Sequence, residues 1–174
     1  AHLERAGLIK ANLSGAHLAL AHLEEATLDE AHLEGADLPL AHLEKASLEE
    51  AHLEGATLLE AHLEEATLAE AHLERAKLQR AHLEGANLYG AHLEGAFLML
   101  ASLNEAHLGG AELRAANLRG ANLEGCTGLT SDQLSKAILD EHTKLPPEFQ
   151  DMIPAPMDEV DGDGPAGDDE NPEE

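Results

Sequence analysis

The chain has 174 residues, of which 35 are acidic and 10 are basic, so its formal charge is −25 with its 12 histidines neutral. No stretch approaches the roughly 18 to 20 consecutive apolar residues of a membrane span, and no basic segment followed by an apolar one begins the sequence. The charge disfavours direct binding to nucleic acid or anionic membranes, because both require clustered Lys and Arg. The single cysteine, Cys126, excludes internal disulfides and thiolate metal clusters. We therefore expect a cytoplasmic protein whose partners present basic surfaces.

A five-residue repeat fills the first 125 residues. Alanine occupies every fifth position from Ala1 to Ala121, and leucine every fifth position from Leu3 to Leu123, without exception. In an α-helix this period would spread the leucines around all sides, and in a flat strand it would send them alternately to opposite faces. The remaining solution is a chain that turns once per unit, with Ala and Leu pointing to one interior. The pattern predicts an all-β solenoid with an aliphatic core.

Units such as Ala11-Asn12-Leu13-Ser14-Gly15 and Ala86-Asn87-Leu88-Tyr89-Gly90 resemble those of the pentapeptide-repeat proteins. The resemblance implies a right-handed quadrilateral β-helix in which four units form one coil and each unit forms one face. Residues 1–125 would then make about six coils. Adjacent coils would lie about 4.8 Å apart.

The frame changes at Cys126, which takes an alanine position, and we expect this residue to be a small buried side chain. Thr130 and Gln133 form a capping-box pattern that predicts a helix over about 131–141. Leu134, Ala137 and Ile138 would lie on one face of this helix, and Pro146 would limit its end. We predict that residues 126–149 form a short α-helical cap. The remaining residues, 150–174, are acidic and rich in Pro and Gly, which is typical of a disordered tail.

Histidine and glutamate recur every ten residues on the outward positions. If a coil has 20 residues, the histidines form two ladders on opposite faces, one with His2, His22, His42, His62 and His82, and one with His32, His52, His72 and His92. Glutamate follows each histidine by two residues, and these residues are the candidate binding surface: Glu24, Glu44, Glu64, Glu84, Glu34, Glu54, Glu74 and Glu94.

Three interpretations of the ladders are open. The histidines are weak candidates for zinc or nickel ligands, because parallel side chains do not converge on a tetrahedral ion. They are also candidates for a pH response. The third interpretation is that any stackable polar residue is accepted before leucine, since Asn, Asp, Thr and Ser occur at equivalent positions. We favour this third interpretation, and expect no dedicated metal site and no cofactor.

The sequence favours a function without catalysis. It contains no Gly-rich phosphate loop, and the repeated His-x-Glu pairs do not define one concave site. We predict a rigid acidic binding or scaffold rod for a protein with a basic surface. One alternative is a structural element that self-assembles by end-to-end stacking of coils. The other follows from the resemblance, since some pentapeptide-repeat proteins imitate DNA and thereby inhibit or protect DNA gyrase, a type II topoisomerase.

Overall fold

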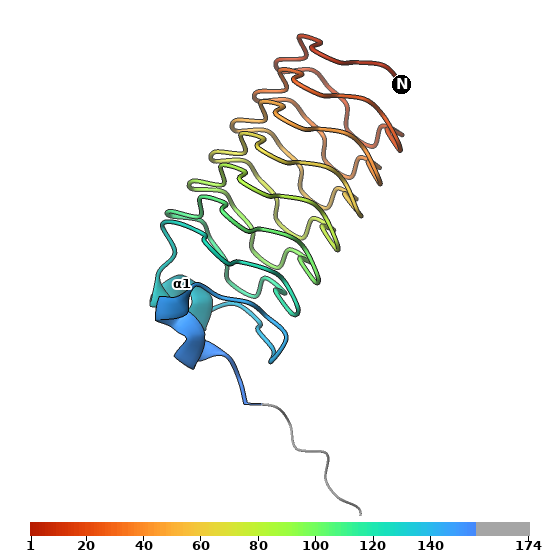
Figure 1. Ribbon diagram of the computed structural model, residues 1–174. Helices are drawn as coiled ribbons and strands as arrows, with labels where there is room; N and C mark the ends of the chain where they lie inside the picture. The colour runs from red at the N-terminus through yellow and green to blue at the C-terminus, as the bar shows by residue number, and fades with distance from the viewer. Residues whose placement is uncertain (156–174) are drawn as a thin grey trace, which may run out of the picture.

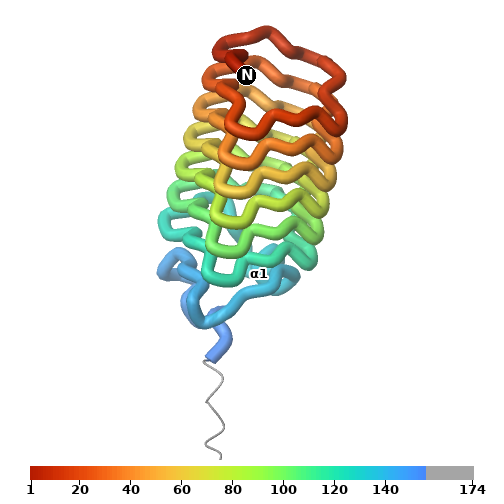
Figure 2. The backbone as a smooth tube through the Cα atoms, turned by 90° about the vertical axis from the view of Figure 1, so that its right-hand side faces the viewer, coloured from red at the N-terminus to blue at the C-terminus, as the bar shows by residue number. Residues whose placement is uncertain are grey.

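The computed structural model describes residues 1–155, which form a column of stacked coils with a closing segment at one end (Figures 1 and 2). The second residue of each unit makes a parallel bridge to the residue twenty positions further along, beginning with His2 and His22 and continuing to His107 and Thr127. Four units therefore complete one coil. The stacked rings of His22 and His42 show the spacing between coils, because their centroids lie 4.9 Å apart.

The coils are joined by single bridges, and no continuous strand is assigned within residues 1–155. Each unit has one bridging residue followed by a two-residue turn, because a chain that changes direction every five residues leaves no room for a longer ladder. The main-chain bonds between coils are nonetheless short. The Leu63 amide donates to the His82 carbonyl at 2.7 Å, and the His62 amide donates to the Ala41 carbonyl at 2.9 Å.

The last residue of every unit up to Gly125 lies in the left-handed region of backbone conformation. Its φ angle ranges from 53° at Glu60 to 71° at Gly125. Glycine adopts this conformation without steric cost, but most of these positions hold other residues. The turn it forms is closed by a bond across each corner, such as that from the Ala66 amide to the Leu63 carbonyl at 3.1 Å.

The core is the aliphatic stack that the repeat predicts. From Ala21 to Leu123, every repeat alanine and every central leucine is buried. In the first coil, Leu3, Leu8 and Leu13 are only partly buried, because among the described residues no coil covers their outer side. Cys126 is buried at the end of this stack, and its thiol donates to the Leu103 carbonyl at 2.9 Å.

The twenty-residue register divides the column into four faces. Each face consists of every fourth unit, and it is numbered by the order in which the chain first reaches it. Face 1 comprises the units that begin at Ala1 through Ala121, face 2 those at Ala6 through Ala106, face 3 those at Ala11 through Ala111, and face 4 those at Ala16 through Ala116.

A short helix, α1 (Ser131–Ser135), begins the closing segment and packs on the last coil (Figure 1). The predicted capping box is confirmed: the Thr130 hydroxyl accepts from the Gln133 amide, and the Gln133 side chain accepts from the Thr130 amide. The Gln133 side chain also donates to the carbonyls of Leu108 and Ala111, at 2.8 and 2.9 Å. Gln133 therefore links the start of the helix to the coil beneath it.

The expected helix over 131–141 is wrong in extent, because α1 ends at Ser135. The chain then leaves the helix to satisfy the open edge of the last coil. Ile138 bridges to Asn117, and Lys144 bridges to Asn122. Ile138 consequently lies at the surface and does not join Leu134 in the core. The hydrogen bonds offered by the unpaired coil edge outweigh the continuation of a short helix.

The chain remains ordered past the boundary that we predicted for the tail. A 3-10 helix, η1 (Pro147–Met152), follows Leu145, and Met152 and Ile153 pack against the core. The Gln150 side chain donates to the Leu145 carbonyl, which ties η1 to the preceding segment. The rest of the predicted tail, residues 156–174, lies outside the described residues. Within residues 1–155, no helix has the length and apolar character needed to cross a bilayer.

Replacing Leu63, a fully buried leucine at mid-column, by alanine is expected to lower the free energy of unfolding by about 3 kcal/mol, because a cavity opens in a stack that cannot collapse. The matched change Leu3→Ala in the first coil should lower it by less than half as much, because Leu3 is already partly exposed. Denaturant unfolding followed by circular dichroism measures both values. Equal losses would contradict the difference in burial.

Candidate functional site

The structure brings together the histidines and glutamates that the sequence selected. Bridges connect His22, His42, His62 and His82 on face 1, and they connect His32, His52, His72 and His92 on face 3. The first series of bridges begins at His2 and continues beyond His82 through Ser102 to Asn122, and the second series runs from Asn12 to Glu112. We call these two sets, each with its following glutamates, the face 1 ladder and the face 3 ladder. The predicted division between two faces agrees with the bridges.

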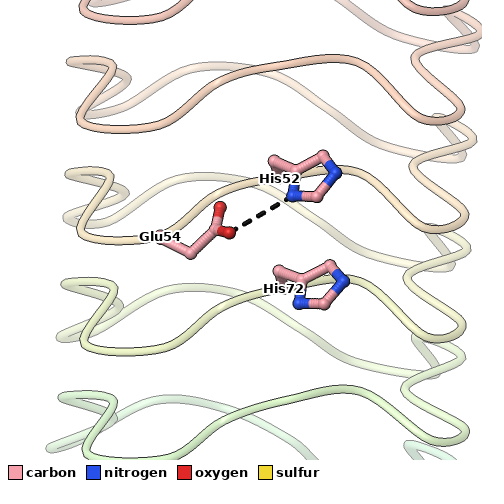
Figure 3. A group of neighbouring side chains, drawn as sticks. All are labelled: His52, Glu54 and His72. Carbon is pink, nitrogen blue, oxygen red and sulfur yellow. Dashed lines mark hydrogen bonds and ion pairs between the residues drawn. The ribbon is translucent and has the colours of Figure 1, made fainter.

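The imidazoles of each ladder are stacked. Their ring centroids lie between 4.7 and 5.0 Å apart, and the rings are within 7° of parallel. Figure 3 shows His52 directly above His72, with the Glu54 carboxylate beside them on the Nδ1 side. The sequence predicted the ladder but not the ring orientation, because the orientation depends on rotamers that the repeat does not specify. The hydrogen bond to the following glutamate favours this rotamer, and the His-x-Glu spacing in the sequence is the feature that could have predicted it.

Each histidine is paired with the glutamate of its own unit. The Nδ1 to Oε1 distance is 3.0 Å for His42 and Glu44 and 2.8 Å for His32 and Glu34, and it lengthens to 3.4 Å for His82 and Glu84. A carboxylate only accepts hydrogen bonds, so Nδ1 carries the proton in these pairs. The described residues provide no hydrogen bond to Nε2 of the ladder histidines.

Pairing shifts the pKa of one residue in each of two ladder units, Glu34 and His42. The hydrogen bond from His32, aided by bonds from its own backbone and from Ser14, lowers the pKa of Glu34 to about 2 against the opposing effect of burial. The bond to Glu44 raises the pKa of His42, and the neighbouring carboxylates Glu24 and Glu64 add to the effect, while burial opposes it. The ionised form of Glu34 and the protonated form of His42 are therefore each favoured by the partner in the same unit.

The second oxygen of most ladder glutamates is buried without a partner. This is so for Oε2 of Glu24, Glu44, Glu54, Glu64, Glu74 and Glu84 within the described residues. In Glu94 the buried Oε2 is the oxygen that faces His92, at 4.0 Å. Unpaired carboxylate oxygens, stacked at the spacing of the coils, are energetically unfavourable because like charges repel and hydration is lost. A donor from outside that met these carboxylates would relieve this cost. Sequence alone could not show this feature, since it depends on the depth of each oxygen.

Possible metal ligands lie close together on both ladders. Donor atoms of His52, Glu54 and His72 all lie within 4.8 Å of one another, as do four sets of two glutamates and one histidine on face 1. A zinc ion about 2.1 Å from two nitrogens spans at most about 4.2 Å between them. The ring centroids of His52 and His72 lie 4.8 Å apart in nearly parallel planes, so these two rings would have to tilt for equivalent nitrogens to share one ion.

The acidic residues are unevenly divided among the four faces of the repeat. Face 1 carries nine glutamates against Arg5 and Lys45, whereas faces 2 and 3 carry five acidic residues each, against one and two basic residues. Face 4 carries two acidic and three basic residues. Face 1 is therefore the most negative surface of the column.

The thiol of Cys126 is buried and is not in a reactive, ionised state. Burial raises the pKa of the Cys126 thiol to about 12, so the thiol stays protonated at neutral pH. The ladder pairs recur in equivalent surroundings from coil to coil. On face 3, the ladder glutamates Glu54, Glu74 and Glu94 line an open surface hollow together with Arg75 and Arg114. The geometry defines a repeat protein of stacked four-sided coils with charged outer faces.

The chain belongs to the pentapeptide-repeat family. The family profile, described as pentapeptide repeats, matches eight copies over residues 6–44, 46–85, 68–104 and 101–127. Proteins of this family fold as right-handed quadrilateral β-helices and are generally structural or binding proteins without enzymatic activity. The twenty-residue register and the buried Ala and Leu positions agree with this fold.

Solved structures similar to the chain are also pentapeptide-repeat proteins. HetL, involved in heterocyst differentiation regulation in the cyanobacterium Nostoc, is 34% identical, with 83% of this chain and 72% of HetL covered and a TM-score of 0.45. A protein from the Arabidopsis thaliana thylakoid lumen is 28% identical, with 68% and 71% covered and a TM-score of 0.47. QnrB1, a plasmid-mediated fluoroquinolone resistance protein, is 18% identical, with 77% of each chain covered and a TM-score of 0.47. A search of curated proteins gave no match.

We predict that Glu44→Gln lowers the pKa of His42, because it removes the charge that stabilises the imidazolium. Histidine resonances followed by NMR against pH measure the shift. Glu50→Gln on face 2 is the control and should leave His42 unchanged. A raised folded-state pKa stabilises the fold at low pH, so the contribution of this pair declines as pH rises through the folded-state pKa of His42. An unaltered His42 titration in Glu44→Gln would show that the pair does not couple.

For Glu34 the sign is opposite, because its folded-state pKa is lowered. Its contribution to stability is complete above the unfolded value of about 4.5 and is lost as the pH falls towards about 2. The difference in unfolding free energy between the parent chain and Glu34→Gln should therefore shrink over this interval. Denaturant titrations at several pH values measure it, and a difference that stays constant with pH would contradict the assignment.

Proposed function

We propose that the column is a non-catalytic binding rod and that face 1 is its docking surface for a basic segment of a partner protein. The observation that supports this most strongly is the uneven distribution of charge, since face 1 has nine glutamates and only two basic residues. The ladder fixes Glu24, Glu44, Glu64 and Glu84 one coil apart, at the spacing of about 4.9 Å seen in the stacked histidines. A partner therefore meets a regular row of carboxylates on a rigid scaffold.

The buried Oε2 atoms support the same proposal. A ladder glutamate uses one oxygen for its histidine and leaves the other without a donor in the described residues. A small rotation of the side chain would bring the second oxygen to an approaching Lys or Arg, and charge-assisted hydrogen bonds of this kind are stronger than neutral ones. Binding would then replace repulsion between stacked carboxylates by attraction to the partner.

A synthetic decalysine peptide tests the proposal directly. We expect the full chain to bind it with an affinity that falls as salt increases, because salt screens the attraction between the carboxylates and the lysines. Replacing Glu24, Glu44, Glu64 and Glu84 by glutamine should weaken binding about tenfold or more, at about 0.3 to 0.5 kcal/mol for each lost pair. Fluorescence anisotropy of the labelled peptide measures the dissociation constants.

The control variant removes the same number of charges from face 2, by replacing Glu30, Glu49, Glu50 and Glu70 with glutamine. It should weaken peptide binding by a smaller factor than the face 1 variant does. Equal losses in the two variants would mean that only the net charge attracts the peptide, and would refute a docking role for face 1.

The narrower DNA-mimic hypothesis makes a separate prediction. If it holds, the full chain inhibits DNA supercoiling by DNA gyrase, and added duplex DNA relieves the inhibition. The face 1 glutamine variant should then lose inhibition. If the chain binds the peptide but has no effect on gyrase, the result supports the binding rod and refutes the DNA-mimic hypothesis.

A further inference from the structure

Face 4 gathers most of the exposed large apolar side chains. Within residues 1–155 nine such residues are exposed, and six of them belong to face 4: Leu20, Leu40, Leu59, Phe97, Met99 and Leu100. Ile138 is a seventh, because its bridge to Asn117 continues this face into the closing segment. The other two, Ile9 and Tyr89, lie on face 2. Single exposed apolar residues are ordinary, but their concentration on one face indicates an interaction surface.

The backbone makes three of these leucines unusual. Leu20, Leu40 and Leu100 hold the left-handed corner position, with φ between 55° and 60°, where glycine fits without strain. Ten glycines occupy the left-handed region elsewhere, among them Gly15, Gly35 and Gly55. A leucine there costs about 1 to 2 kcal/mol relative to ordinary backbone conformations and is still exposed, by 60% for Leu20 and 56% for Leu100. Burial in the core of this chain therefore does not account for these side chains.

The distribution of charged residues among the four faces favours a second copy of the chain as the partner of face 4. A second copy of the chain also carries −25, so faces 1, 2 and 3, on which acidic residues outnumber basic ones, would repel it. Face 4 carries Lys77, Arg80 and Arg119 against Asp37 and Glu60, and it is the one face of the repeat without an excess of negative charge. The apolar residues and the charge balance thus coincide on the same face.

The order of charges along face 4 favours one relative direction of the two columns. Arg80 already lies 3.5 Å from Glu60 of its own chain, so these two charges compensate each other and the preferred direction depends on Lys77 and Asp37. In a parallel pair related by a two-fold axis, Lys77 would meet its own copy and repel it. In an antiparallel pair, the coil that contains Lys77 can come opposite the coil that contains Asp37. The same arrangement sets Leu20 and Leu40 toward the end of the partner that carries Phe97 and Leu100. An isologous interface of this kind closes on itself.

We propose that face 4 is a self-association surface, through which two copies of this chain pack side by side and antiparallel. This proposal is independent of the docking role of face 1. The interface is one side of a narrow column, so the dimer is a weak one that forms reversibly at high concentration. Because the two copies carry like net charge, added salt strengthens the dimer, whereas it weakens the binding of a basic peptide to face 1.

Sedimentation equilibrium of the full chain between about 10 and 500 µM tests the proposal, since this range covers weak interfaces. We expect a monomer–dimer equilibrium that shifts to dimer with salt. The triple variant Leu20→Gly, Leu40→Gly, Leu100→Gly should weaken the dimer about tenfold or more, through lost apolar contact. Glycine suits the backbone at these corners, so thermal unfolding of the variant should remain close to that of the parent.

The control variant Ile9→Ser, Tyr89→Ser removes the exposed apolar residues of face 2 at the same net charge, and it should dimerise like the parent. A monomer at every concentration would overturn the proposal. So would a dimer or larger assembly that persists unchanged in the leucine variant, since that result would place the contact on another face or at the ends of the column.

A second pair of variants tests the antiparallel direction. Lys77→Gln should weaken an antiparallel dimer, because it removes attraction to the coil of the other copy that contains Asp37, and it should strengthen a parallel one by removing repulsion. Arg75→Gln on face 3 gives the same change in total charge and is the control. A stronger dimer in the face 4 variant than in this control would overturn the antiparallel arrangement.

Discussion

Main-chain hydrogen bonds with a register of twenty residues connect every coil to the next, and the position of each side chain follows from them. Because the bonds repeat without slippage from the first coil to Thr127, residues twenty apart lie directly above one another. The aliphatic interior, the imidazole stacks and the placement of Leu20, Leu40 and Leu100 on one face all result from this alignment. Its energetic support is the burial of alanine and leucine, which leaves three residues of every five available to the surface.

The interior was predictable because it depends on period alone. A strict alternation of Ala and Leu within five residues admits only a turning chain, and the structure buries those positions from Ala21 to Leu123. The closing segment was less predictable. Local signals at Thr130 and Gln133 gave the start of α1 correctly, but its end was set by the open edge of the coil, which attracts Ile138 and Lys144 from outside the helix. Long-range pairing of this kind is invisible to a local pattern.

On the outer faces, too, some features were predictable from the sequence and others were not. The register placed the ladder residues on two faces, but the pairing of His42 with Glu44 and the buried second oxygens depend on side-chain rotamers. The apolar strip was accessible from the sequence, because Leu20, Leu40 and Leu100 share the register of the corner position. The exposure of these corner side chains follows from the register, because residues twenty apart in the sequence share one face of the column.

The left-handed corner and the ten-residue spacing of the His-Leu-Glu motif together constrain how the repeat array can lengthen by gene duplication. Duplication of a ten-residue segment adds half a coil and rotates everything downstream by half a turn, which exchanges face 1 with face 3 and face 2 with face 4. The histidine ladders survive this exchange, because both faces carry the same motif. The alignment of the corner leucines on face 4 does not survive, since a half-coil insertion between Leu40 and Leu100 would place them on opposite faces. Selection that maintains Leu20, Leu40 and Leu100 in line would thus admit duplications of whole coils and reject half coils, whereas the ladders alone would tolerate either.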